Sequence, residues 1–259
     1  MPAIVEIECQ GAIARVWFNR PEKHNALSAE VGTALVAALR GLAADDRCRV
    51  VVLGGRGASF CAGADLDAMK ASANASFEAN LAEAESLGGM FAALADFPKV
   101  VVGRIHGGVY GGGVGFTCAC DIAVASDDAK FGLTEARLGI VPGLISPYVV
   151  RRLGDRHSRE LMLTGERFDA ATALRVGLVH HVVPAAELDA KVSERVGEVL
   201  KSGPRAQGRI KQLLSHFANT GWDEYRAGLP RTLAEVRRGD EAREGLAAFF
   251  EKRKPKWME

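Results

Sequence analysis

Two glycine-containing loops are the part of this sequence best suited to chemistry. The first spans residues 60–66 (Phe-Cys-Ala-Gly-Ala-Asp-Leu) and the second residues 106–113 (His-Gly-Gly-Val-Tyr-Gly-Gly-Gly), and each follows a β-branched segment and leads into a helical one. Backbone N–H groups at a helix start have no intrahelical partner and carry the positive end of the peptide dipole. If the loops converge, two such amides can stabilise an oxygen atom that gains negative charge, as in an oxyanion hole.

The segments around these loops alternate between strand and helix patterns. Residues 4–9 and 12–18 alternate apolar and polar side chains, which predicts a hairpin. Ser28 is placed to cap a helix that ends near Ala44. The other expected elements are strands at 49–54, 100–105 and 121–125, helices at 76–95 and 112–120, a helical turn at 133–138 and a loop at 55–63. This alternation continues to Val183 and predicts an α/β fold.

The carboxyl-terminal part of the chain has no strand pattern. From residue 185 onward, amphipathic segments are separated by Gly203-Pro204, Gly221 and Gly239-Asp240. We therefore expect a core of residues 1–184 followed by a helical region of residues 185–259.

Composition limits the class of protein. The 259 residues are 48% apolar and 25% charged, and a chain of this size buries roughly 70–75% of its surface. The net charge of +1 supplies no field to hold nucleic acid. No run approaches the roughly 18–20 apolar residues of a membrane span. The first residues do not resemble an export signal, and the five cysteines have no paired spacing. We expect a cytoplasmic protein with neither a nucleic-acid nor a membrane partner.

Common cofactor and metal motifs do not match this chain. Gly111–Gly115 lacks the sixth-position glycine of the dinucleotide fingerprint, and neither Gly-Lys-Ser/Thr nor Gly-x-Ser-x-Gly occurs. Cys118 and Cys120 lie in an apolar helical segment typical of a core. His180 and His181 have no carboxylate or thiol at ligand spacing beside them. The sequence therefore predicts neither a bound cofactor nor a metal site.

Five ordered motifs resemble the enoyl-CoA hydratase/isomerase (crotonase) superfamily along essentially the whole chain. They are Arg20-Pro-Glu-Lys-His-Asn-Ala-Leu27, Phe60-Cys-Ala-Gly-Ala-Asp-Leu66, Gly107-Gly-Val-Tyr-Gly-Gly-Gly113, Cys120-Asp-Ile122 and Phe131-Gly-Leu-Thr-Glu-Ala-Arg-Leu-Gly-Ile-Val-Pro-Gly143. The resemblance implies a spiral of ββα units with a carboxyl-terminal helical region that forms trimers, which often pair into hexamers. It also implies an acyl-CoA substrate, so that coenzyme A enters as the substrate thioester and not as a cofactor.

The resemblance also assigns roles to residues. It implies that the backbone N–H groups of Ala64 and Gly112 bind the thioester oxygen, in agreement with the oxyanion-hole hypothesis. Lys23 and Lys252 resemble positions that meet the coenzyme's phosphates, the latter from a neighbouring subunit; alternatively, Lys252 belongs to a solvated helix end whose cations suit the dipole. The other substrate-binding positions implied by the motifs are Ala26, Ala62, Asp65, Leu66 and Gly111.

The catalytic carboxylates depart from the hydratase pattern. The resemblance implies two glutamates beside the double bond, of which one is present as Glu135 and the other falls on Gly115. The missing carboxylate is dispensable, is replaced from elsewhere, with Glu83 or Glu85 as candidates, or marks altered chemistry. For hydration, we expect Glu135 to deprotonate the water that attacks C3 and to return a proton to C2 on the same face.

The leading hypothesis is an acyl-CoA hydratase of the hydro-lyase type. The alternatives are an isomerase or a carbon–carbon lyase or decarboxylase on the same scaffold, and a non-catalytic acyl-CoA-binding protein. Residues 112–121 and 140–150 are similar to bacterial methylglutaconyl-CoA hydratase-like proteins of leucine catabolism, and the second segment is expected to help form the acyl pocket. A branched or glutaconyl-type substrate is therefore expected; a glutaconyl carboxylate would need a nearby cation, for which Arg104 and His106 are candidates.

Overall fold

The computed structural model describes residues 2–258 and contains a six-stranded sheet in the order β1-β2-β3-β5-β7-β10. Its strands are β1 (Val5–Gln10), β2 (Ile13–Phe18), β3 (Val50–Gly55), β5 (Val100–Ile105), β7 (Ile122–Ser126) and β10 (His181–Val183). The β1–β2 hairpin is antiparallel, and every other neighbouring pair is parallel. The predicted hairpin and the three predicted buried strands are confirmed.

A second sheet of four short strands, in the order β4-β6-β8-β9, carries the loops that were expected to do chemistry. Its strands are β4 (Ser59–Cys61), β6 (Gly108–Tyr110), β8 (Lys130–Gly132) and β9 (Arg167–Asp169). The prediction of a loop over residues 55–63 was wrong, because β4 lies within it. Three-residue strands are too short to show an alternating pattern, so the sequence could not reveal this sheet.

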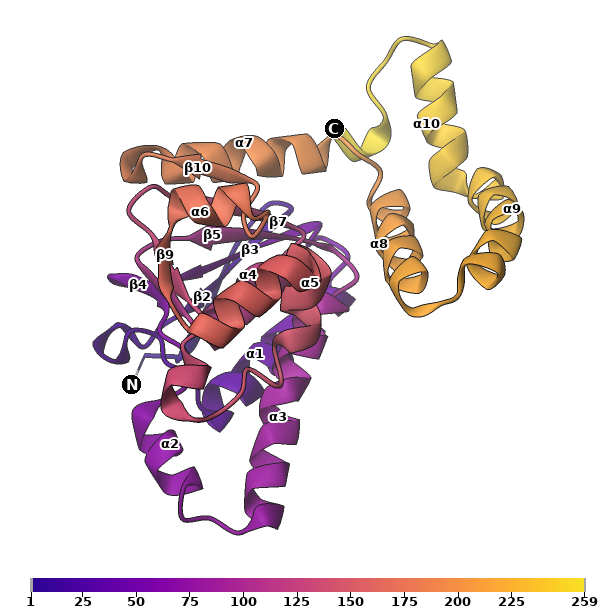
Figure 1. The fold of residues 1–259 in the computed structure, drawn as a ribbon. Coiled ribbons are helices and arrows are strands. Elements are labelled where there is room, and N and C mark those ends of the chain that lie inside the picture. Colours follow the sequence, from indigo (N-terminus) through magenta and orange to yellow (C-terminus); the bar gives the residue numbers. More distant parts are fainter. Residues whose placement is uncertain (1, 259) are drawn as a thin grey trace.

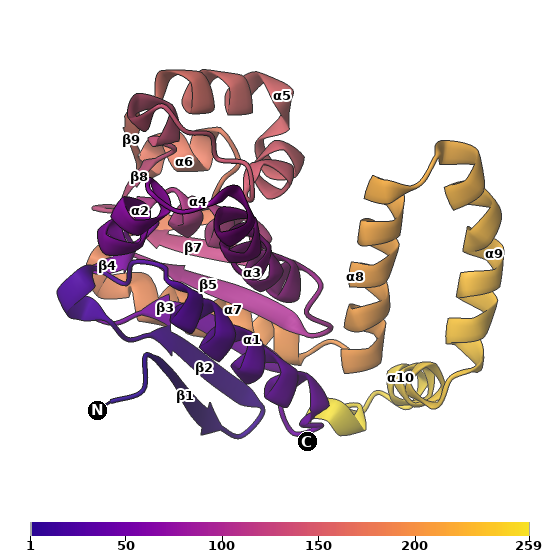
Figure 2. The ribbon, with the colours of Figure 1, turned by 90° about the horizontal axis from the view of Figure 1, so that it is seen from below.

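Helices cover both faces of the large sheet (Figures 1 and 2). The helices of the core are α1 (Ala29–Ala44), α2 (Leu66–Ser72), α3 (Phe77–Ala95), α4 (Gly112–Ala119), α5 (Ser146–Thr164), α6 (Ala170–Arg175) and α7 (Leu188–Leu200). Alternate residues of β3 belong to different cores: Val51 and Leu53 pack in the core that includes α1 and α3, whereas Val50 and Val52 pack against α7. This two-sided burial explains the continuous β-branched run.

The order of elements repeats a strand of the large sheet, a strand of the small sheet and then a helix. The units β3-β4-α2, β5-β6-α4 and β7-β8-α5 follow this pattern, with the short 3₁₀ helix η2 (Glu135–Leu138) before α5. The expected α/β spiral of ββα units is thus observed. The side chain of Ser28 accepts a hydrogen bond from the N–H of Val31, as expected of the cap of α1.

The last three helices form an arm that extends away from the core (Figures 1 and 2). They are α8 (Pro204–Asn219), α9 (Trp222–Arg238) and α10 (Asp240–Phe250). The 3₁₀ turn η3 (Ala185–Glu187) precedes α7, and the 3₁₀ turn η4 (Lys256–Met258) ends the described chain. Lys211 of α8 donates to Asp121 at 2.7 Å and to the carbonyl of Lys99 at 3.0 Å, which ties the arm to the core. No helix within residues 2–258 is long and apolar enough to cross a membrane.

Candidate active site

The two glycine-containing loops meet at the small sheet. Parallel pairing of β4 with β6 sets Ser59 opposite Gly108 and Cys61 opposite Val109, so the segments that follow these strands start side by side. A Cβ built on Gly63 would lie 3.8 Å from the Cα of Gly111, and a Cβ on Gly111 would lie 3.8 Å from the Cα of Gly63. The convergence expected from the sequence is therefore present.

The backbone at these glycines directs the next two amides away from the protein's own acceptors. Gly63 has φ of +91° and Gly111 has φ of +49°, which side chains rarely allow. The N–H groups that follow, those of Ala64 and Gly112, donate to no carbonyl or side chain among residues 2–258. Gly112 is the first residue of α4, but Ala64 precedes the cap of α2 at Asp65. The expectation of two helix starts thus holds for α4 only, and the turn at Gly63 orients the other amide.

A network of polar contacts holds the first loop. The N–H of Leu27 donates to the carbonyl of Gly63 at 2.7 Å, and the N–H of Asp65 donates to the carbonyl of Leu27 at 2.9 Å. The side chain of Asp65 is 7% exposed and accepts from Arg20 at 2.9 Å and from the N–H of Asp67 at 2.9 Å. Although burial acts in the opposite direction, these hydrogen bonds hold the pKa of Asp65 below its usual value. Both carboxylate oxygens of Asp65 are thus engaged within the protein.

The other expected substrate-binding positions lie around this loop. Lys23 pairs with Asp67 at 2.8 Å and with Asp65 at 3.4 Å. The carbonyl of Ala26 accepts from Arg20 at 2.8 Å, the N–H of Ala62 donates to the carbonyl of His24 at 3.0 Å, and the side chain of Leu66 is 71% exposed. Arg20 was not predicted as a site residue from the sequence, although it begins the first motif.

Glu135 reaches the second loop from η2. Its Oε1 atom lies 3.1 Å from the point that a Cβ on Gly111 would occupy. Its Oε2 atom is buried and has no hydrogen-bond partner within residues 2–258. Burial raises the pKa of Glu135, and no neighbouring charge contributes to that shift. A carboxylate in this state can act as a base or an acid on a substrate beside the amide of Gly112.

The space in front of Gly115 is filled by apolar side chains. A Cβ on Gly115 would overlap Cγ2 of Ile145 and lie 2.9 Å from its Cβ and 3.1 Å from Cε1 of Phe91. Glu83 and Glu85 lie on α3, and neither affects the pKa of Glu135. Ile145 and Phe91 were not identified as site residues from the sequence; the only signal was the unusual segment at 140–150.

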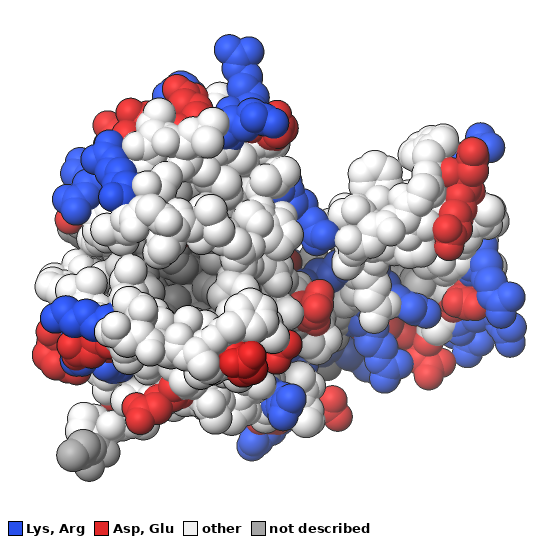
Figure 3. Space-filling model, turned by 60° about the horizontal axis from the view of Figure 1, so that its bottom comes forward, with Lys and Arg blue, Asp and Glu red and all other residues white. Residues whose placement is uncertain are grey.

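Apolar side chains are also frequent on the surface near this site. Leu138 is 61% and Val141 79% exposed just after Glu135, and Phe77 at the start of α3 is 75% exposed. Figure 3, with the end of the molecule that carries α2 and α3 turned forward, shows a hollow with mostly uncharged side chains around it. This surface suits a hydrocarbon group better than a charged one.

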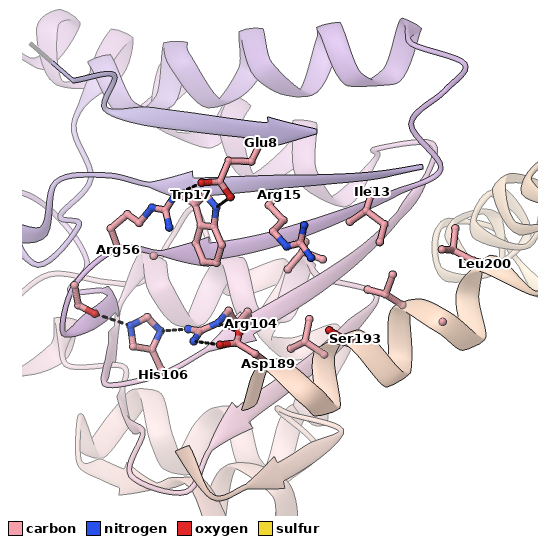
Figure 4. Close-up of a pocket in the computed structure, with 16 residues that line it drawn as sticks. Glu8, Ile13, Arg15, Trp17, Arg56, Arg104, His106, Asp189, Ser193 and Leu200 are labelled. Carbon is pink, nitrogen blue, oxygen red and sulfur yellow. Dashed lines mark hydrogen bonds and ion pairs between the residues drawn. The ribbon is translucent and has the colours of Figure 1, made fainter. Parts of the chain in front are cut away.

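Arg104 and His106 point into a different groove of about 660 Å³, between the large sheet and α7 (Figure 4). Arg104 pairs with Asp189 at 2.6 Å and contacts Nδ1 of His106 at 3.2 Å, while Nε2 of His106 lies 2.9 Å from the carbonyl oxygen of Gly57. Neither residue is therefore available to a substrate beside Glu135. Lys252 follows the end of α10, which lies far from α2 in its own chain (Figure 1).

The side chains of Cys61, Cys118 and Cys120 are buried. Burial raises the pKa of Cys61, Cys118 and Cys120 to about 12 in each case, so these thiols are protonated at neutral pH. Within residues 2–258, no group of three or more histidine, cysteine or acidic side chains could hold a metal ion.

Comparison with known proteins decides the family. Residues 8–259 match the model of the family described as enoyl-CoA hydratase/isomerase. The chain belongs to this family. Enoyl-CoA hydratase/isomerase relatives include the short-chain-enoyl-CoA hydratase of Clostridium acetobutylicum, 31% identical over 96% of this chain and 95% of the relative. The carnitinyl-CoA dehydratase of Proteus mirabilis is 32% identical over 99% of both chains.

Solved structures share the fold of this chain. An enoyl-CoA hydratase from Shewanella pealeana superposes with a TM-score of 0.94 at 35% identity, covering 98% of this chain and 96% of the other. Pseudomonas aeruginosa AtuE superposes with a TM-score of 0.95 at 35% identity, covering 99% and 100%. The fold is that of crotonase, and the chain is an enzyme of this hydro-lyase family.

Proposed function

We propose that this enzyme adds water across the 2,3 double bond of an enoyl-CoA. In this proposal the thioester oxygen accepts hydrogen bonds from the N–H groups of Ala64 and Gly112, which favours the enolate that forms when C3 is attacked. Glu135 takes a proton from water as the oxygen bonds to C3, and then returns a proton to C2. The names of the Clostridium and Proteus relatives support hydration or its reverse.

The observation that carries the proposal is the position and state of Glu135. Its Oε2 atom is buried and has no hydrogen-bond partner among the described residues, and its Oε1 atom stands beside the glycine that precedes the Gly112 amide. Burial raises the pKa of this carboxylate, and a general acid or base works best when its pKa lies near the pH of the reaction. The two free amides supply the other half of the proposed site.

The test follows loss of the conjugated-thioester absorbance when the purified enzyme is mixed with crotonyl-CoA or 3-methylglutaconyl-CoA. Hydration bleaches this absorbance, whereas a protein that only binds acyl-CoA leaves it unchanged. The expectation of a glutaconyl-type substrate stays a prediction, and the second thioester tests it. Absence of turnover with both thioesters would count against hydration.

Double-bond migration is a second candidate, favoured by the packing of Ile145 against Gly115. Moving a double bond requires only that one base remove a proton from one carbon and return it to another. Starting from a 3-enoyl-CoA, Glu135 alone can do this by taking a proton from C2, which gives a dienolate whose oxygen the same two amides can bind, and by returning the proton to C4. Incubation with 3-hexenoyl-CoA, followed by the appearance of conjugated-thioester absorbance, distinguishes migration from hydration.

For substrate binding, we propose that Lys23, Ala26, Ala62, Leu66 and Gly111 contact the thioester or its coenzyme. Asp65 has the role of holding the loop, because its oxygens are already engaged. The apolar surface in Figure 3 is the proposed entrance for the acyl chain.

We further propose a homotrimer or a hexamer. Large apolar side chains of the arm are exposed by half or more and need a cover, namely Ile210, Leu214, Phe217, Trp222, Phe249 and Phe250. Assembly would also bring Lys252 of a neighbouring subunit to the coenzyme's phosphates. Light scattering on the eluted protein should give three or six times the 27.6 kDa chain mass; one chain mass would contradict assembly.

A further inference from the structure

The side chain of Ile145 occupies the volume that any side chain at position 115 would need. A Cβ on Gly115 would overlap Cγ2 of Ile145 and lie 2.9 Å from its Cβ. On the other side, Cε1 of Phe91 would be 3.1 Å away. Ile145 is 3% exposed and Phe91 is 2% exposed, so both belong to the core.

Neither of these side chains can easily move. The carbonyl of Ile145 accepts from the N–H groups of Tyr148 at 3.1 Å and Val149 at 3.0 Å, which fixes its backbone to the first turn of α5. The ring of Phe91 lies 4.7 Å from that of Phe116 and 6.2 Å from that of Tyr148, centroid to centroid. The closest overlap is with Cγ2 of Ile145, which branches directly from Cβ, so rotation of the end of the side chain cannot relieve it, whereas truncation to alanine removes it.

This packing has a chemical consequence on α4. The Cβ of a side chain at position 115 would meet Ile145 and Phe91, so a carboxylate there would have to be accommodated among apolar side chains, where the loss of hydration is costly. In hydration, one O–H bond of water breaks while C3–O and C2–H bonds form. In migration of a 3,4 double bond into conjugation, a C2–H bond breaks and a C4–H bond forms. In both reactions Glu135 alone can carry the proton that is removed and the proton that is returned.

We propose that Ile145 is a specificity-determining residue, which restricts this active site to a single acid–base group, Glu135. The inference rests on the proposed function, since it concerns which groups move protons there. It goes further because it attributes the single acid–base group to the packing of Ile145, at the start of α5, and not only to the absence of a side chain at Gly115. Removing the Ile145 side chain should therefore make room for a second carboxylate from α4.

A stability cycle tests the packing without any assay of activity. Gly115→Ala should lower the unfolding free energy in the wild-type background and cost clearly less in an Ile145→Ala background. Val149→Ala is the matched control, because Val149 lies one turn further along α5 and is 0% exposed. Gly115→Ala should remain as costly beside Val149→Ala. Equal costs of Gly115→Ala in all three backgrounds would overturn the proposal.

An activity comparison tests the specificity. Gly115→Glu combined with Ile145→Ala should raise the ratio of hydration to migration at least about 10-fold over Ile145→Ala alone, since a second acid–base group contributes about 10²–10⁴-fold when well placed. The pH profile of kcat/KM should also gain a second ionisation, which a purely structural change would not produce. A folded double variant with an unchanged ratio of hydration to migration and no second ionisation would overturn the proposal. A single Gly115→Glu variant with wild-type stability, a raised ratio and a second ionisation would also overturn it.

The two proposals fail in different ways. If wild-type enzyme turns over no enoyl-CoA, the proposed function fails, whatever the stability cycle gives. If wild-type turnover depends on Glu135 but the cycle shows no coupling between positions 115 and 145, only the role of Ile145 fails.

Discussion

Oε1 of Glu135 lies 3.1 Å from the point that a Cβ on Gly111 would occupy. The glutamate follows β8 and the glycine follows β6, and these strands are parallel neighbours in the small sheet. The N–H of Gly111 also donates to the carbonyl of Gly132, the last residue of β8, at 2.9 Å. The sheet thus sets the separation between the proposed base and the proposed oxyanion donor, and no long side chain has to span it.

The first prediction concerns turnover. Glu135→Gln keeps the size of the side chain and removes its ability to carry a proton, so kcat on the best enoyl-CoA should fall by at least about 10²-fold. The matched control is Glu166→Gln, at an exposed glutamate outside the site, which should leave kcat unchanged. Near-normal kcat in a folded Glu135→Gln variant would exclude the acid–base role.

The second prediction concerns the pH dependence of the rate. As the base, Glu135 must be ionised, and burial raises its pKa above the usual 4.5. kcat/KM should therefore fall as pH decreases through this raised pKa, which lies above the pKa of an exposed glutamate. Steady-state rates measured across the acidic pH range give the apparent pKa of kcat/KM. A profile that turns down only below 4.5 would show that the ionisation seen is not that of a buried Glu135.

The third prediction concerns stability. Because the folded-state pKa of Glu135 is raised, the native protein binds a proton more tightly than the unfolded chain does. Stability from this group is fully present below pH 4.5 and is lost as pH rises through the folded-state pKa. Glu135→Gln should therefore be more stable than the wild type at neutral pH, and the difference should shrink in acid. Denaturant unfolding at both pH values measures this, and a Glu135→Gln variant less stable at neutral pH would contradict it.

The fourth prediction separates backbone strain from site chemistry. Gly111→Ala places a side chain at φ of +49° and against Glu135, whereas Gly11→Ala has φ of +57° and nothing within 4 Å. Gly11→Ala should lose about 1–2 kcal/mol of unfolding free energy from its positive φ. Gly111→Ala should lose at least as much, because its ψ of −113° lies outside the left-handed helical region. Only Gly111→Ala should also lower kcat, because it displaces the carboxylate. Equal kcat values for the two variants would contradict the proposed placement of Glu135.

The sequence predicted the two loops, the strands before them and the position of Glu135 in a helical turn because these depend on local signals. Glycines, β-branched runs and a serine cap act over a few residues. Local signals could not predict that Ile145 obstructs Gly115, because the contact is between α4 and the start of α5, thirty residues apart in the chain. The small sheet was missed for a related reason: pairing between three-residue strands depends on tertiary context, not on pattern.

The expected helix start at the first loop illustrates the same limit. Asp65 was assigned to substrate binding by motif, but its side chain caps α2 and pairs with Arg20. A motif records which residues occur together and does not distinguish a ligand contact from a contact that shapes the loop. The orientation of the Ala64 amide follows from Gly63, whose φ cannot be inferred from the spacing of residues alone.

The fifth prediction tests Asp65 as the residue that holds this loop. Asp65→Ala removes the cap of α2 and leaves the guanidinium of Arg20, 15% exposed, without its carboxylate. Loss of one partner of a buried pair costs about 3–5 kcal/mol, and we expect unfolding free energy to fall by an amount of this order. Asp67→Ala is the matched control, because Asp67 is 75% exposed and its one ion pair within residues 2–258 is with half-exposed Lys23. An exposed pair contributes about 0–1 kcal/mol.

Asp65→Asn refines this test, because the amide oxygen can still cap α2 while the charge on Arg20 loses its partner. The loss of stability should then be smaller than in Asp65→Ala. Since the N–H of Asp65 and the carbonyl of Gly63 both pair with Leu27 beside Ala64, we expect kcat to fall in both Asp65 variants and not in Asp67→Ala. If KM alone rises with kcat preserved, Asp65 contacts the substrate as the motif implied, and the amide of Ala64 is held by other means.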